Sequence, residues 1–275
     1  EHRHAVATIP HQLNNLFANN YKKLNNALLR ASSDTIKDWM NFKFNLTPGI
    51  MSVLHTFGEK KNQHNHAHMI VSMGGINKQT GALETVALDF IPYRFLSQKF
   101  RIKFQDILIE LFDNDELVHD LNTRKELLQL LNKTKSNNWR FHFERPMKSP
   151  EKVIKYIGRY SKRACISERK ITEISGEYIS FVYKDNRDRD KETNKPTEKI
   201  KTMHYTKFFP TLLQHVPPTG YQIIRYYGIY ANSFKIDKTY TEKPPLEKDD
   251  NTNYSNPKKC ENCQTDKKLY AVNIQ

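Results

Sequence analysis

The sequence has few cysteines and no long apolar runs, and both shortages narrow the class of protein. Three cysteines among 275 residues are an odd number that cannot make a disulfide framework, so we expect a reducing compartment. No stretch approaches the roughly 18 consecutive apolar residues of a membrane-spanning helix, and the N-terminus lacks the charged-then-apolar layout of a secretory signal. These absences predict a cytoplasmic protein without a membrane partner.

Acidic residues are also in short supply. Asp and Glu number 30 against 44 Lys and Arg, which gives a formal net charge of +14 and a pI near 9.5. Because polyphosphate is the commonest biological counterpart of such a charge excess, nucleic acid is the leading candidate partner. A basic protein that is merely soluble is the alternative. With 37% hydrophobic residues, the chain can bury a substantial core.

The spacing of apolar residues predicts both helices and strands. A short strand is expected from His2 to Pro10, then helices from about Leu13 to Phe44, then a hairpin whose second strand ends at Gly74 and Gly75. Further along, the pattern predicts a strand before Pro92, helices over 93–131, a strand over 139–146, a helix after Pro150, three strands of a small appended sheet, a short helix, and a last strand over 221–230. From residue 238 onward there is no apolar periodicity, which is typical of a poorly ordered tail.

The segment "QHNHAHMIV" in the second hairpin strand carries the first candidate site. Residues two apart in a strand share a face, so His66 and His68 project together. Two imidazoles are a serviceable pair of ligands for a divalent cation, and they leave an open coordination sphere of the kind used in catalysis. The alternative is a pair of surface histidines. His64 and His55 are both candidates for a third ligand, and Ile70, where a carboxylate would be needed, disfavours a metallo-hydrolase.

The helix that contains "YIGRYSKR" carries the second candidate site. Tyr156 and Tyr160 are four residues apart and therefore on one face, among the cations Arg159, Lys162 and Arg163. Nearby cations or a metal would favour the phenolate, which can displace a DNA strand and form a phosphotyrosine bond that keeps the energy of the broken linkage. Ordinary core packing of two aromatic residues is the alternative interpretation.

Five motifs, taken together and in this order, resemble rolling-circle transposases of the IS ninety-one type, which belong to the HUH endonuclease superfamily. They are "HTFG", "HNHAHMIV" with its glycine pair, "YIGRYSKRACISERKI", "FVYKDNRD" and "YQIIRYYGIYAN". The resemblance covers roughly Arg3 to Lys235. It implies that His66 and His68 bind Mg or Mn, and that Tyr156 and Tyr160 form 5′-phosphotyrosine links during single-strand transfer.

The resemblance also implies an architecture. It predicts an α+β fold in which a central antiparallel sheet, flanked by helices, presents the histidines beneath the tyrosine helix. Residues 1–165 would form this nuclease core, 166–237 an appended β-rich region continuous with it, and 238–275 a flexible tail.

Two features depart from the family pattern. Ala67, between the two histidines, is smaller than the usual hydrophobic residue. Family members generally carry a cysteine-rich zinc module before the "HRHAV" strand, whereas this chain begins at that strand, so we expect the module to be lost or truncated. The "CENC" segment with Cys260 and Cys263 is half of a zinc site, which a histidine or another chain would have to complete.

The sequence therefore predicts a transposase that nicks and rejoins single-stranded DNA at transposon ends, associated with the nucleoid of a bacterial-type cell. Tyr226 and Tyr227 are candidate stacking surfaces for DNA bases. The candidate phosphate contacts are Arg159, Lys162, Arg163, Lys99, Arg101, Lys103 and Arg225. The alternatives are a plasmid or phage replication initiator or relaxase of the same superfamily, and a non-catalytic nucleic-acid-binding protein.

Overall fold

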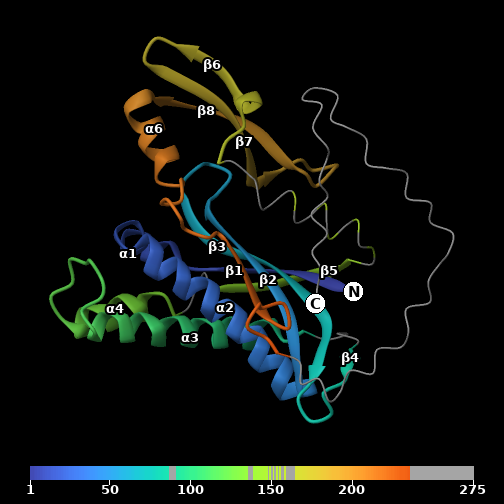
Figure 1. Ribbon diagram of the computed structural model, residues 1–275. Coiled ribbons are helices and arrows are strands. Elements are labelled where there is room, and N and C mark those ends of the chain that lie inside the picture. Colours follow the sequence, from blue (N-terminus) through green and yellow to red (C-terminus); the bar gives the residue numbers. More distant parts are fainter. Residues whose placement is uncertain are drawn as a thin grey trace, which may run out of the picture. The chain divides into compact units, whose positions relative to one another are not determined.

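The computed structural model describes residues 1–86, 91–135, 139–147, 149, 151, 153, 155, 158 and 165–235, without the side chains of 186 and 187. It has the α+β fold that the sequence predicts, with a large antiparallel sheet flanked by helices and a separate small sheet (Figure 1). None of the helices in these ranges is both long enough and apolar enough to cross a membrane.

The main sheet contains strands from both ends of the described chain. Its path runs in the order β5-β1-β3-β2-β9, every pair is antiparallel, and β4 also pairs with β3. The strands are β1 (His2–Thr8), β2 (Leu46–Phe57), β3 (Gln63–Asn77), β4 (Leu83–Thr85), β5 (Arg140–Met147) and β9 (Ile224–Gly228). The long central strands β2 and β3 form the predicted hairpin.

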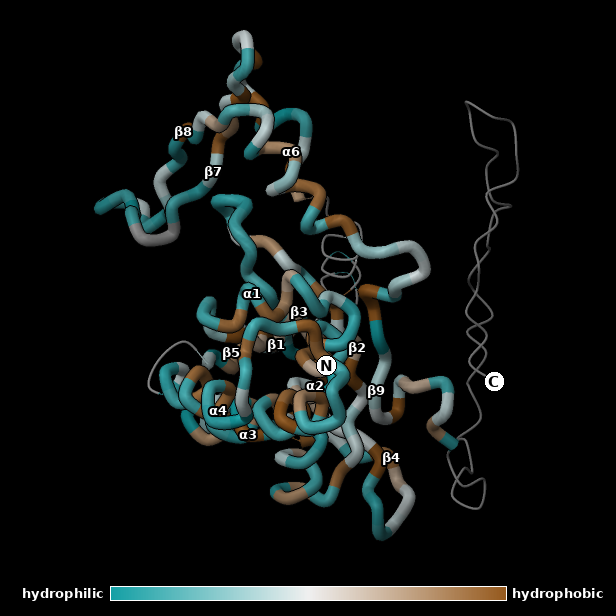
Figure 2. The backbone as a smooth tube through the Cα atoms, turned by 90° about the vertical axis from the view of Figure 1, so that its left-hand side faces the viewer, coloured by the Kyte–Doolittle hydropathy of each residue, from teal (hydrophilic) through white to brown (hydrophobic). Residues whose placement is uncertain are grey.

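Helices cover one face of this sheet and bury the core there. They are η1 (His11–Leu13), α1 (Asn14–Asn19), α2 (Tyr21–Phe44), α3 (Tyr93–Asp113) and α4 (Arg124–Lys133). Apolar residues of α2 and α3, such as Leu28 and Phe104, pack with Met69 and Phe141 of the sheet. Hydrophilic and hydrophobic stretches alternate along α3 and α4 in Figure 2, as expected for helices with one buried face. Helix α2 ends at Phe44, and the left-handed φ of 56° at the next residue, Asn45, is typical of a helix C-terminus.

The prediction that the second hairpin strand ends at Gly74 and Gly75 is wrong. Strand β3 continues past Gly74 and Gly75 to Asn77. The glycines are needed because the backbone is crowded on both sides: a Cβ on Gly75 would lie 2.1 Å from the Thr47 carbonyl oxygen, and one on Gly74 would lie 2.1 Å from that of Glu84. The glycine pair therefore allows β2 and β4 to approach β3 closely, and it does not end β3.

The small sheet also follows the prediction. It has the order β6-β7-β8, from strands β6 (Ile171–Ser175), β7 (Tyr178–Arg189) and β8 (Pro196–His204), preceded by η2 (Glu168–Lys170) and followed by α6 (Tyr205–Leu213). Two ion pairs join this region to the β2–β3 turn. Asp185 of β7 pairs with Lys60 at 3.3 Å, and Lys170 of η2 pairs with Glu59 at 3.4 Å. The chain then returns to the main sheet as β9, beside β2.

Candidate metal centre

Strand alternation gives the main sheet two chemically different faces. Met69 and Val71 of β3 point into the helix-covered core, so His66 and His68, at the alternate positions, point away from it. In the register of the hairpin, His55 of β2 pairs directly with His66 and therefore lies on the same face. We call this side of the sheet the histidine face.

Three imidazoles converge at one point on the histidine face. One ring nitrogen each of His55, His66 and His68 lies within 4.8 Å of the other two. The Nε2 atoms of His66 and His68 are 3.1 Å apart. Two ligands at right angles, each about 2.1 Å from a six-coordinate cation, would be about 3.0 Å apart. The three residues can therefore hold a divalent metal ion and leave part of its coordination sphere open.

The hydrogen bond at the far side of the His66 ring fits metal binding. Its Nδ1 is 2.7 Å from the backbone oxygen of His64. A carbonyl oxygen only accepts, so Nδ1 of His66 carries the proton and donates it. In the neutral ring, the Nε2 lone pair then points toward His68, where a cation can accept it.

The His68 ring is bonded on its far side to a fourth histidine. Its Nδ1 is 2.9 Å from Nε2 of His4, and Nδ1 of His4 is 3.0 Å from a carboxylate oxygen of Glu144. The His4 side chain is only 3% exposed. Its burial lowers the pKa of His4 from the ordinary value, and the hydrogen bond to Glu144 opposes that change only in part. His4 therefore favours the neutral form.

Of the two candidates for a third ligand, the structure brings His55 into the cluster. His55 is 6% exposed, and its ring centroid lies 4.6 Å from that of His68. His64 lies at the start of β3, and its backbone oxygen holds the His66 ring.

The predicted phosphate contacts on α3 and β9 lie away from this cluster. Lys99, Arg101 and Lys103 belong to α3 on the helix-covered side, and Lys103 forms an ion pair with Asp38 at 2.6 Å. The structure therefore does not bring the α3 cations to the histidine face.

The β9 residues divide between the two faces of the sheet. Arg225 pairs with Ser52 on the helix side and donates to the Asn26 side chain of α2 at 2.9 Å. Tyr226 is 52% exposed on the histidine face, whereas Tyr227 faces the helices, where burial raises its pKa to about 12.

Several predicted site residues lie outside the described part of the chain. They are Tyr156, Tyr160, Arg159, Lys162, Arg163, Cys260 and Cys263. The nucleophile and zinc assignments therefore stay predictions.

The start of the predicted tyrosine helix is described. Residues 151, 153, 155 and 158 are helical. Val153 packs against the small apolar cluster of Met51, Val53 and Ile70. Val53 pairs with His68 in the hairpin register, so this cluster lies on the histidine face beside the imidazoles. Val153 therefore lies next to the candidate metal centre.

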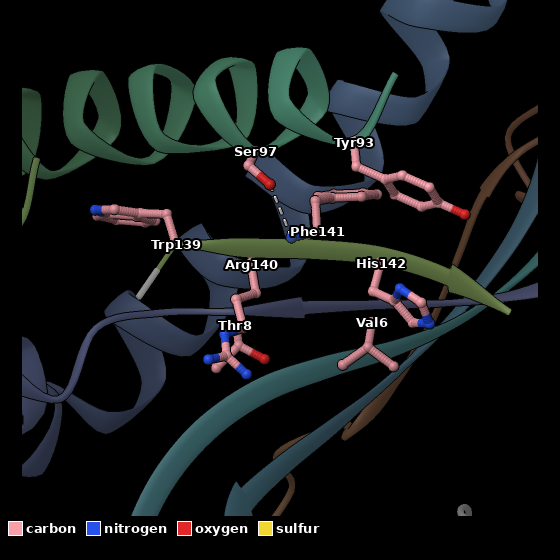
Figure 3. Close-up of a pocket in the computed structure, with 8 residues that line it drawn as sticks. All are labelled: Val6, Thr8, Tyr93, Ser97, Trp139, Arg140, Phe141 and His142. Carbon is pink, nitrogen blue, oxygen red and sulfur yellow. Dashed lines mark hydrogen bonds between the residues drawn. The ribbon is translucent and has the colours of Figure 1, made fainter. Parts of the chain in front are cut away.

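A cleft of about 490 Å³ opens at the edge of the same sheet (Figure 3). Arg140 of β5 pairs with Thr8 of β1, which pairs in turn with His66, so the three share one row across the histidine face. Tyr93 of α3 stacks on His142 along the cleft, with ring centroids 5.7 Å apart. With strands about 4.8 Å apart, Arg140 stands about 10 Å from the His66 position. A cation and two rings thus lie at the sheet edge, two strands from the candidate metal centre.

Sequence reasoning missed His4, Glu144 and Arg140. The only local signal was the alternation of His2 and His4 in "HRHAV", which resembles that of the histidine strand. It could not be interpreted without the order of the strands, because β1 and β5 approach β3 only through long-range pairing.

A family model described as "Putative transposase" matches residues 49–237. The chain is 30% identical over 243 residues to a protein of Sinorhizobium fredii described as "Putative transposase y4qJ", covering 86% of this chain and 60% of that one. It is 27% identical over 236 residues to the "Transposase for insertion sequence element IS801" of Pseudomonas savastanoi pv. phaseolicola, covering 84% and 54%. No solved structure matches at a significant level.

The fold and the histidine cluster thus belong to a chain whose relatives are described as transposases. The chain belongs to this transposase family, of the IS ninety-one type, as the sequence motifs predicted. It spans 60% and 54% of the lengths of the two curated relatives.

Proposed function

We propose that this chain nicks and rejoins single-stranded DNA at transposon ends through a 5′-phosphotyrosine intermediate, in rolling-circle-type transposition by an HUH-type mechanism. The residues that would hold the divalent metal, Mg or Mn, are His55, His66 and His68, whose ligand atoms already converge. Family membership supports the transposase role. The observation that carries the mechanism is the packing of Val153 on the histidine face.

The position of Val153 bears directly on the tyrosines. Residues three and seven positions after a given residue share its side of a helix. Tyr156 and Tyr160 occupy those positions after Val153 in the sequence. A helix that starts with Val153 against the sheet and keeps its spacing would therefore direct both phenols toward the histidine face.

The chemistry would be an in-line displacement at one phosphodiester. A deprotonated tyrosine oxygen attacks phosphorus, a new tyrosine O–P bond forms, and the bond to the 3′ oxygen breaks, so the leaving strand ends in a 3′ hydroxyl once that oxygen takes up a proton. A bound divalent ion supplies Lewis-acid polarisation of the phosphate oxygens. The second tyrosine can attack another phosphodiester while the first holds its strand, and reversal of the first step rejoins the DNA.

The surroundings of the cluster suit a DNA strand. Arg140, in the same row as His66, offers a bidentate donor for a neighbouring phosphate. Tyr93 and His142 on one side, and the exposed Tyr226 on the other, offer rings on which bases can stack. The net charge of +14 favours such binding at modest salt.

A single-stranded oligonucleotide that carries a transposon end and a label at its 3′ end, incubated with the chain and Mn²⁺, tests the proposal. We expect a labelled band of protein size that survives denaturing electrophoresis. His66→Ala should abolish this adduct and leave most of the DNA binding, because phosphate contacts carry affinity separately from metal chemistry. Binding without any adduct would instead support a non-catalytic module, and release of product without a protein-linked strand would support a metallo-hydrolase.

A further inference from the structure

A line of three hydrogen-bonding groups crosses three adjacent strands behind the metal cluster. The Glu144 carboxylate of β5 lies 3.0 Å from Nδ1 of His4 in β1, and Nε2 of His4 lies 2.9 Å from Nδ1 of His68 in β3. This line ends at the candidate metal ligand, whose other nitrogen faces His66 at 3.1 Å.

The donors and acceptors along this line match in one direction. If His68 ligates through Nε2, its proton sits on Nδ1, which can then only donate. Nε2 of His4 must accept that bond, so the proton of the neutral His4 ring sits on Nδ1. This atom lies 3.0 Å from a carboxylate oxygen of Glu144, which can accept a hydrogen bond from it. Donors and acceptors then match along the line, and the His68 lone pair is directed at the metal position.

The backbone is shaped to bring Glu144 into place. Ala5 pairs with Phe143, but Arg3 pairs with Pro146, so two residues of β5 stand opposite His4. Such a β-bulge re-aims a side chain and often occurs beside an active site. Phe143 points into the core, so the next residue, Glu144, emerges on the histidine face.

We propose that His4 and Glu144 are positioning residues that fix the tautomer and orientation of the His68 ring for metal binding. The inference rests on the proposed metal role of the cluster. The two ligands have different hydrogen-bond partners. The His66 ring is bonded to a neutral backbone carbonyl, whereas the His68 ring is bonded to His4, which in turn contacts the Glu144 carboxylate. A carboxylate at the end of such a line raises the basicity of the ligand, and loss of such partners typically weakens metal binding about 10- to 100-fold.

Isothermal titration of the metal-free full chain with Mn²⁺, in the absence of DNA, tests this role. Glu144→Ala should weaken Mn²⁺ binding about 10- to 100-fold. Glu144→Gln should lose less, because an amide oxygen at the same position still accepts from His4. The Glu144 side chain is 55% exposed, so neither variant should disturb folding. Glu173→Ala, an exposed glutamate of β6, is the matched control and should bind as the unaltered chain does.

The tautomer of His68 is a second readout, and it would not change if Glu144 had only a structural role. Two-bond ¹H–¹⁵N correlation spectra of the chain loaded with diamagnetic Mg²⁺ should show the His68 proton on Nδ1. In Glu144→Ala the two His68 tautomers should mix, and Glu144→Gln should restore the single form.

Two results would separate the inference from the function on which it rests. Equal Mn²⁺ affinity in the unaltered chain, Glu144→Gln and Glu144→Ala, with binding still lost in His66→Ala, would overturn the positioning role and leave the metal centre intact. Absence of Mn²⁺ binding by the unaltered chain would overturn the metal centre, and the inference with it.

Discussion

The histidine cluster makes a quantitative prediction for the variant His55→Ala. A metal that binds only the folded chain stabilises it, and removal of one of three converging imidazoles should remove most of that stabilisation. His55 also stacks on Phe57, with ring centroids 5.6 Å apart, so the variant will be less stable even without metal. The informative quantity is therefore the change in melting temperature that Mn²⁺ produces within each protein.

The size of this change follows from linkage. At a free Mn²⁺ concentration 100 times the dissociation constant, binding adds about 2.7 kcal/mol to the free energy of unfolding. For chains of this size, each kcal/mol raises the melting temperature by about 2–4 °C, so the unaltered chain should gain about 5–10 °C. Loss of an outer partner alone weakens metal binding up to about 100-fold. Loss of a ligand should do at least as much, which leaves about 0.4 kcal/mol, or about 1 °C.

Differential scanning calorimetry with and without Mn²⁺ measures both shifts. His142→Ala is the matched control, because this imidazole lies on the same face, paired with Val6 and outside the cluster. It should keep the full Mn²⁺ shift. A shift in His55→Ala as large as in the unaltered chain would show that His55 is not a ligand. A shift lost equally in His142→Ala would show that binding is not confined to the cluster.

Three further predictions follow from other parts of the fold. Burial lowers the pKa of His215 from 6.5, so the unfolded chain binds a proton at this residue more readily than the folded chain does. The free energy of unfolding, measured in urea, should therefore fall as the pH falls below about 6.5. In His215→Gln this fall should be less steep. Arg140→Ala should weaken single-stranded DNA binding and reduce the salt slope, measured by fluorescence anisotropy, by about 1, whereas an unchanged slope would remove Arg140 from the phosphate contacts. Phe104→Ala, in the fully buried core under the sheet, should cost about 3–5 kcal/mol in urea unfolding and leave the Mn²⁺ affinity of the folded chain unchanged.

The hairpin and the histidine pair could be predicted because their signals are local. Alternation over β3 fixes which residues share a face, and a one-residue slip would bury His66 and His68 in the core. The same alternation could not decide between His55 and His64 as the third ligand, because that choice depends on the register between β2 and β3. Pairing of His55 with His66 resolves the geometry.

The rest of the site depends on pairings between distant segments. Glu144 and His4 are 140 positions apart in the sequence, and a bulge in β5 that no composition signal marks brings them together. Arg225 has the charge expected of a phosphate contact, but its strand pairing puts it on the helix side with Asn26. Residue type therefore predicted which chemistry was present, and strand order decided which residues take part.

Peptide mapping of the covalent DNA adduct tests the proposed phosphotyrosine mechanism. The chain is incubated with Mn²⁺ and a single-stranded transposon end, digested with protease and nuclease, and analysed by mass spectrometry. We expect a nucleotide joined through its 5′ phosphate to Tyr156 or Tyr160, and we expect it to be lost when both are replaced by phenylalanine and in His66→Ala. An adduct on any other residue, or one that forms undiminished in these variants, would contradict the phosphotyrosine mechanism.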